Sequence, residues 1–175
     1  MRNLVFVLFL LSTTCFGEEV SVRAKADDRP LPPQEYYVQA SKQLVFGNYR
    51  LAFTDKKPDN DDLKLLEKVL GQIDGWYTEY AKEKKITKAP LVCIGIRFHN
   101  NMFQSRDWKT NKMINVLGCT RVINNKQFWI KMAYLSDWDS LWHEFGHGFF
   151  DWDHPVDDEK IKDWVAFCQK KFSKL

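Results

Sequence analysis

The sequence predicts an α+β domain in which helices pack against one mixed β-sheet. Apolar residues recur at helical spacing between Leu63 and Tyr80, and a second helical pattern follows residue 136. Segments rich in β-branched and aromatic residues, typical of strands, separate these helical stretches. The length of 175 residues fits one domain, and the 15% of aromatic residues is enough to build its core.

The first elements of this domain are expected to be a strand and a long helix. The segment 43–53 has strand composition, with a possible bend at Gly47. Asp59 and Asp61 can cap the helix and place acidic charge in its first turn. The lysine-rich run 82–85 then supplies positive charge near the end of the helix.

The middle of the chain predicts three further strands. Residues 91–98 follow a proline and read as a buried strand. Residues 113–123 and 127–135 form two more strands, which the pair Asn124–Asn125 is expected to join as a hairpin.

Two helices complete the expected fold. Ser136 can cap the first of them, with Asp139 at the third helical position, and the helix should run to about Phe150. A short loop ends at Pro155, where the last helix opens. One face of that helix is apolar and includes Ile161, Trp164, Val165, Cys168 and Phe172.

The N-terminus has the layout of a secretory signal peptide. A basic end is followed by a short apolar run and then by small residues, which places cleavage after Gly17. The run is too short for a stable membrane span. The alternatives are an uncleaved anchor and a lipid attached to Cys15. The mature protein is expected to be secreted or periplasmic, with a flexible lead-in over 18–34 and the compact domain over 35–175.

Charge and composition exclude one class of partner. The chain carries a net charge of +3, and loss of Arg2 with the signal peptide leaves 3 − 1 = +2. Lysines alternate with acidic residues and form no basic stripe, so no nucleic-acid partner is expected. The oligomeric state is left open.

Three cysteines remain after removal of the signal peptide, and they allow two interpretations. Export permits a disulfide, and Cys93 with Cys119 is the pair expected because both lie in strand-like segments. Alternatively all three, with Cys168, are small buried apolar residues.

The segment HEFGH, from His143 to His147, predicts a zinc site. Two histidines four residues apart lie on the same face of a helix and can chelate one Zn²⁺. Glu144 lies beside the metal and is expected to act as general base on a zinc-bound water that attacks a peptide carbonyl. A structural helix with exposed histidines is the alternative.

A catalytic zinc also needs a third protein ligand. His154 and its neighbour Asp153 follow in the loop after the helix. We expect His154 to be the ligand because imidazole is the better donor for zinc. Asp153 could instead bind the metal or hydrogen-bond to an imidazole. His99 is expected to be an ordinary surface residue.

The segment HEFGHGFFDWDHP resembles the active-site segment of the zincin metallopeptidases, and more narrowly of the metzincins, whose pattern is HExxHxxGxxH or ends in Asp. It is also similar to small bacterial and phage proteins with HELGH and a nearby Asp-His. His143, Glu144 and His147 match the motif. The resemblance implies a zincin-like mixed sheet with an edge strand just before the active-site helix, which would place residues 127–135 near the substrate.

The sequence departs from the metzincin pattern in three places. Phe150 stands where the motif has glycine, and Asp153 stands at the third-ligand position, one residue before His154. No methionine follows His154, so the family's Met-turn is missing. The predicted function is an exported zinc metallopeptidase acting on peptides or proteins. The alternatives are a non-catalytic zinc-binding or structural module and a cell-wall peptide amidase that uses the same site.

Overall fold

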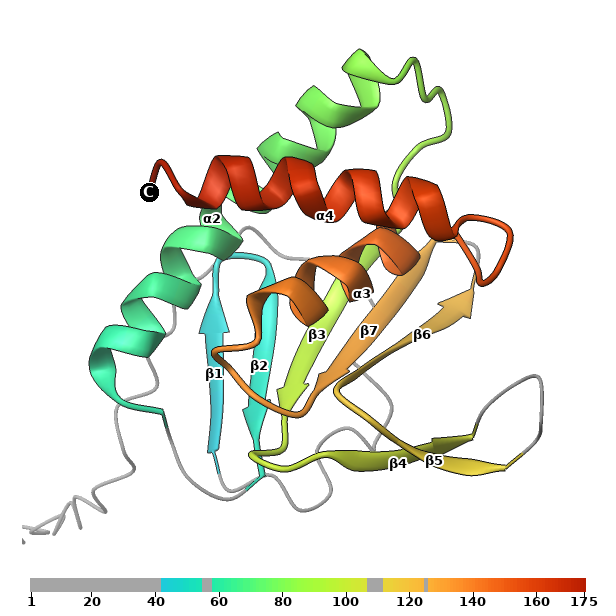
Figure 1. The fold of residues 1–175 in the computed structure, drawn as a ribbon. Coiled ribbons are helices and arrows are strands. Elements are labelled where there is room, and N and C mark those ends of the chain that lie inside the picture. Colours follow the sequence, from blue (N-terminus) through green and yellow to red (C-terminus); the bar gives the residue numbers. More distant parts are fainter. Residues whose placement is uncertain (1–41, 55–57, 107–111, 125) are drawn as a thin grey trace, which may run out of the picture.

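The computed structural model of the protein describes residues 42–54, 58–106, 112–124 and 126–175. The expected signal peptide, the lead-in and the first residues of the expected domain lie outside these ranges. The described part is mixed α+β, with helices packed against a mixed sheet, as the sequence predicts (Figure 1).

The main sheet has five strands and is mixed in direction. Its order is β1-β2-β3-β7-β6. The central pairs β2–β3 and β3–β7 are parallel, whereas β1 and β6 each pair antiparallel with their neighbour. The strands are β1 (Lys42–Phe46), β2 (Tyr49–Phe53), β3 (Val92–Phe98), β6 (Gly118–Asn124) and β7 (Gln127–Met132).

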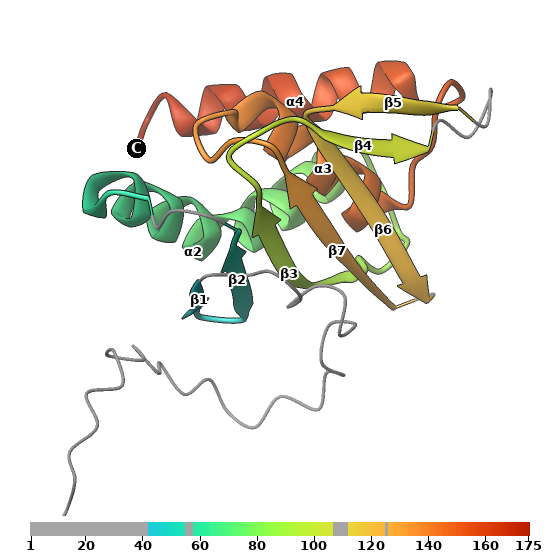
Figure 2. The same cartoon turned by 90° about the horizontal axis from the view of Figure 1, so that it is seen from below.

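Three helices cover one face of this sheet in the described part of the chain (Figures 1 and 2). They are α2 (Asn60–Glu83), α3 (Trp138–Phe150) and α4 (Asp158–Phe172). Asp59 caps α2, where its carboxylate accepts hydrogen bonds from two backbone amides of the first turn. None of these helices is long and apolar enough to cross a membrane.

Two glycines allow helix α3 to pack closely, Gly148 against the sheet and Gly146 against α4. A Cβ at Gly148 would lie 2.1 Å from the Phe128 ring of β7, and one at Gly146 would lie 2.9 Å from the Trp164 ring of α4. The neighbouring Phe145 and Phe149 rings stack with their centroids 5.1 Å apart. The sheet and α4 therefore hold the helix that carries HEFGH from two sides.

The strand expected over 113–123 is in fact two strands. β5 (Met113–Val116) pairs antiparallel with β4 (Phe103–Arg106) in a separate two-stranded sheet, and β6 begins only at Gly118. β4 was not predicted. Its sequence, FQSR, has a single apolar residue and so lacks the apolar pattern that indicates a strand.

The predicted hairpin between the next two strands is confirmed, since β6 pairs antiparallel with β7. The expectation that residues 127–135 form the edge of the sheet is wrong. β7 lies between β3 and β6, and β6 is the edge strand. The physical reason is visible in burial, because nearly all side chains of β7 are buried while those of β6 are half-buried or exposed.

The expected disulfide between Cys93 and Cys119 is also contradicted, because all three described cysteines are free. Cys93 lies on β3 and Cys119 on β6, with β7 between them. Two strand spacings amount to about 9.5 Å, beyond the roughly 7 Å that a disulfide spans between Cα atoms. Cys93 and Cys168 are buried as small apolar residues.

Candidate metal centre

Helix α3 begins one residue later than the sequence indicated. Asp137, not Ser136, is the N-cap, and its Oδ1 accepts a hydrogen bond of 3.2 Å from the Ser140 amide. His143 and His147, both half-buried, lie one helical turn apart on α3. The helical repeat brings their rings one above the other, with centroids 4.8 Å apart.

The end of α3 turns the chain back toward these histidines. Phe150 remains helical, and Asp151 adopts the left-handed conformation with φ 55° and ψ 41°. Lys88 forms an ion pair with the Asp151 carboxylate at 2.8 Å, which ties this turn to the segment before β3. The loop that follows returns His154 to the same side as His143 and His147.

The three histidines form a tight cluster of nitrogen atoms. The Nε2 atoms of His143, His147 and His154 are 3.1, 3.2 and 3.2 Å apart. Tetrahedral zinc with imidazole nitrogens at about 2.05 Å would set its ligands about 3.3 Å apart. The donor set and its spacing therefore fit a zinc ion with three protein ligands and one open position.

Hydrogen bonds on the far side of two rings orient them for this role. His147 Nδ1 lies 2.7 Å from the Trp152 carbonyl oxygen and donates to it, which leaves Nε2 as the lone-pair nitrogen. His154 Nδ1 bonds to the Asp158 carboxylate from the first turn of α4. Such partners fix the tautomer and raise the basicity of a metal-binding imidazole.

The same cluster favours neutral imidazoles. Burial, followed by the neighbouring His147 and His154, lowers the pKa of His143 to about 4. Burial also lowers the pKa of His147. Both rings are therefore neutral at physiological pH, the form in which histidine binds a metal.

Glu144 lies between α3 and the edge strand β6, and it is buried with 6% exposure. The Thr120 hydroxyl lies 2.7 Å from its Oε2 and 2.7 Å from its backbone carbonyl oxygen, and can donate to either. Gly118 leaves room for the carboxylate, since a Cβ there would lie 2.6 Å from Oε1. Burial raises the pKa of Glu144 to about 7.

The structure separates the two candidates for the third ligand. His154 joins the cluster, while the Asp153 carboxylate accepts a hydrogen bond of 2.8 Å from the His154 amide. Asp153 also donates its own amide to the Asp157 carboxylate at 3.1 Å. His99 lies away from the cluster, with Nδ1 3.4 Å from the Thr54 hydroxyl.

Four residues around this centre were not predicted from the sequence, namely Gly118, Thr120, Trp152 and Asp158. Only Asp158 left a signal that could have found it. It lies four residues after His154 at the start of a helix, a spacing at which side chains meet. Thr120 and Gly118 come from a strand 24 and 26 residues before Glu144, and the Trp152 contact uses a backbone atom.

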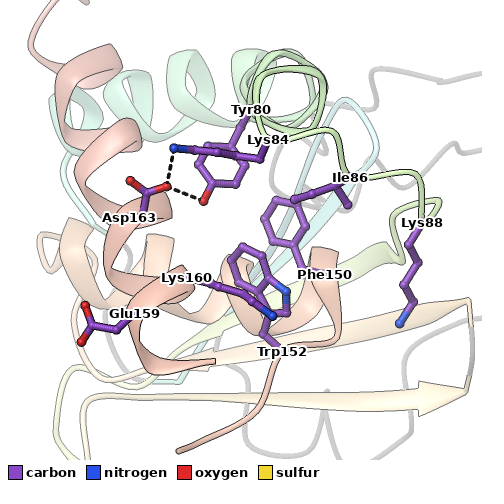
Figure 3. A pocket seen from close by; sticks show the side chains of 9 residues that line it. All are labelled: Tyr80, Lys84, Ile86, Lys88, Phe150, Trp152, Glu159, Lys160 and Asp163. Atoms are coloured by element: carbon purple, nitrogen blue, oxygen red, sulfur yellow. Dashed lines mark hydrogen bonds and ion pairs between the residues drawn. The ribbon is translucent and has the colours of Figure 1, made fainter. Parts of the chain in front are cut away.

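A cavity with aromatic walls lies beside the end of α3, and none of the three clustered histidines lines it (Figure 3). Trp152 stacks on Phe150 with ring centroids 4.1 Å apart, and Tyr80 packs against the edge of this pair. The Asp163 carboxylate accepts a hydrogen bond from the Tyr80 hydroxyl and forms an ion pair with the Lys84 ammonium, each at 2.8 Å. This packing fixes the backbone of Trp152, and with it the carbonyl oxygen that orients His147.

We expect Asp158→Ala to lower zinc affinity about tenfold to hundredfold, because His154 loses the partner that orients its ring. Asp158→Asn, which keeps an oxygen acceptor, should lose less. The affinity is measured by chelator competition, with Glu159→Ala as the control for a neighbouring acidic residue. Wild-type affinity in Asp158→Ala would show that this contact does not position His154.

Searches with protein-family models, against curated proteins and against solved structures found no match to the chain.

Proposed function

We propose that the protein is an exported zinc-dependent peptidase whose centre is formed by His143, His147, His154 and Glu144. The observation that carries this proposal is the convergence of the three imidazole Nε2 atoms. The buried Glu144 carboxylate lies on α3, the helix that also holds His143 and His147. Three histidines and an open position are the ligand set of catalytic zinc, whereas structural zinc sites have four protein ligands.

Each residue of the centre has a distinct role in this proposal. Zinc held by the three histidines would supply a Lewis acid that polarises a carbonyl and acidifies a water. Glu144 accepts the proton of the attacking water and returns it to the leaving nitrogen. Thr120 holds the Glu144 carboxylate by its hydroxyl group, so that the carboxylate keeps one position during proton transfer.

The edge strand β6 supports a peptide as the substrate. Thr120, which contacts Glu144, lies on this strand, and the outer side of β6 has no strand paired to it in the described part of the chain. An extended peptide can bind to such an edge through its backbone amides and carbonyls. A peptide on β6 would then run past the centre on α3.

The resemblance to zincins is part of the proposal and agrees with two features. The HEFGH helix packs on a mixed sheet, and an antiparallel edge strand passes beside it. Three departures remain, because Phe150 replaces the glycine of the motif, His154 comes one residue later than the metzincin ligand, and no methionine follows it. We therefore propose a zincin-like peptidase outside the metzincin pattern.

The proposal is tested with purified protein that lacks the first 17 residues and a broad peptide library. We expect hydrolysis with zinc present, loss of hydrolysis on adding a chelator, and recovery when zinc is restored. Stoichiometric zinc without cleavage of any peptide would instead favour a non-catalytic zinc-binding module. Cleavage of cell-wall peptides alone would identify an amidase that uses the same centre.

A further inference from the structure

A groove between α3 and α4 opens directly beside the proposed centre. It has a volume of about 500 Å³. Helix α3 contributes His143 and Glu144 to its wall, and α4 contributes Lys162, Val165, Ala166 and Gln169. Because two groups of the centre line it, whatever occupies this α3–α4 groove lies next to the reacting bond.

The two ends of the groove differ in charge. Lys162 lies one helical turn after Asp158, which holds His154, so the lysine marks the end close to the histidine cluster. At the far end the Gln169 amide donates to the Asp139 carboxylate at 3.0 Å and ties the two helices together. A cation therefore stands at the end of the groove where α4 begins, and an anion stands at the end where α3 begins.

We propose that the α3–α4 groove is a substrate subsite in which Lys162 binds a carboxylate adjacent to the scissile bond. This inference rests on the proposed peptidase function. The carboxylate can belong to an Asp or Glu side chain or to the C-terminus of the peptide, since both present the same charged group to Lys162.

The neighbours of Lys162 permit this role. Its ammonium pairs with Glu159 at 2.8 Å, and both side chains are largely exposed, with 72% and 87% exposure. An exposed pair of this kind is weak, so a substrate carboxylate can take the place of Glu159. A divalent cation bound by the three histidines would add attraction for the carboxylate.

The rest of the groove limits the size of the acidic group. Val165 and Ala166 offer a small apolar wall that suits one or two methylene groups. Asp139 repels a carboxylate that reaches the far end. The groove therefore favours a short acid held close to Lys162.

The first test compares cleavage of matched peptides that differ next to the scissile bond. One set carries Glu or Gln there, and another ends there in a free carboxylate or an amide. We expect kcat/KM to be about tenfold higher for at least one acidic member, and the set that responds identifies the source of the carboxylate. Lys162→Glu should remove or reverse the preference, and Lys162→Arg should retain it.

Lys170→Glu is the matched control, because it makes the same charge change on α4 at a position that lies toward α2. It should leave both the rate and the preference unchanged. An acidic preference that persists in Lys162→Glu, or the absence of any preference in wild type, overturns the inference while leaving the peptidase proposal intact.

A binding measurement separates this inference from the proposed activity. Calorimetry with zinc-loaded Glu144→Gln should give about tenfold tighter binding of the acidic peptide than of its neutral counterpart, and Lys162→Glu in that background should abolish the difference. Equal binding of both peptides, or binding of neither, overturns the inference. If no peptide is cleaved by wild type, the peptidase proposal fails, and this binding result still decides whether Lys162 holds a carboxylate.

Discussion

Replacing His154 by alanine is expected to lower the affinity for zinc more than a hundredfold. The imidazole provides one of three nitrogen atoms that converge within 3.2 Å of one another, and alanine leaves only two of them. His143→Ala and His147→Ala should cause similar losses, and the double substitution should abolish the roughly one zinc per chain expected for such a ligand set. Elemental analysis and chelator competition give the two quantities.

Asp153→Ala is the critical comparison for His154, since the two residues are adjacent. The Asp153 carboxylate accepts a hydrogen bond from the His154 amide, so its loss should disturb the loop and cost about a hundredfold in affinity at most. His99→Ala should leave zinc binding unchanged. A larger loss in Asp153→Ala than in His154→Ala would give the ligand role to Asp153.

Thermal unfolding provides an independent measure of the same site. Zinc at a hundred times its dissociation constant should stabilise wild type by about 2.7 kcal/mol if it binds only the folded chain. The stabilisation should be absent in the variant lacking His143 and His147. Equal stabilisation by zinc in that variant would place the metal elsewhere.

The three helices and the pair of histidines could be predicted because they depend on local sequence. Helical periodicity identified α2, α3 and α4, and the spacing within HEFGH places both rings on one face wherever the segment is helical. The third histidine was predicted because imidazole is the better donor for zinc, and the length of the chain after the helix agrees with this choice. Without glycine at Phe150, the chain needs one more residue to turn back.

The end of α3 explains how this extra residue is used. In the metzincin pattern the glycine comes three residues before the third ligand. Here the left-handed residue is Asp151, which likewise comes three residues before His154. The helix is extended by one residue through Phe150, and the turn and the clustered histidine are displaced together.

The environment of Glu144 could not be predicted, because it depends on contacts between distant segments. Thr120 meets Glu144 only because β6 is the edge strand and passes beside α3. The resemblance to the metzincins implied the wrong edge strand, and the order of strands along the chain could not correct it, because strand order in a sheet need not follow chain order. The same limit applies to the disulfide, whose exclusion requires knowing that β7 separates Cys93 from Cys119.

Glu144→Gln is expected to retain zinc and the fold while reducing peptide hydrolysis about a hundredfold or more. The amide has the shape of the carboxylate and can still bond to the Thr120 hydroxyl, but it cannot accept the proton of the attacking water. The loss should appear in kcat, with little change in KM. Glu67→Gln, at an exposed position on α2, is the matched control and should behave as wild type.

The Gly118→Ala variant tests whether hydrolysis depends on the position of the Glu144 carboxylate as well as on its presence. The added Cβ would lie 2.6 Å from Oε1, so the carboxylate or the strand must move. If Glu144 acts as general base, this variant should also lose kcat while it keeps zinc and the acidic group. Full activity in Glu144→Gln would contradict the proposed mechanism outright. Full activity in Gly118→Ala alone would contradict this expectation and would show that the position of the carboxylate is not critical for hydrolysis.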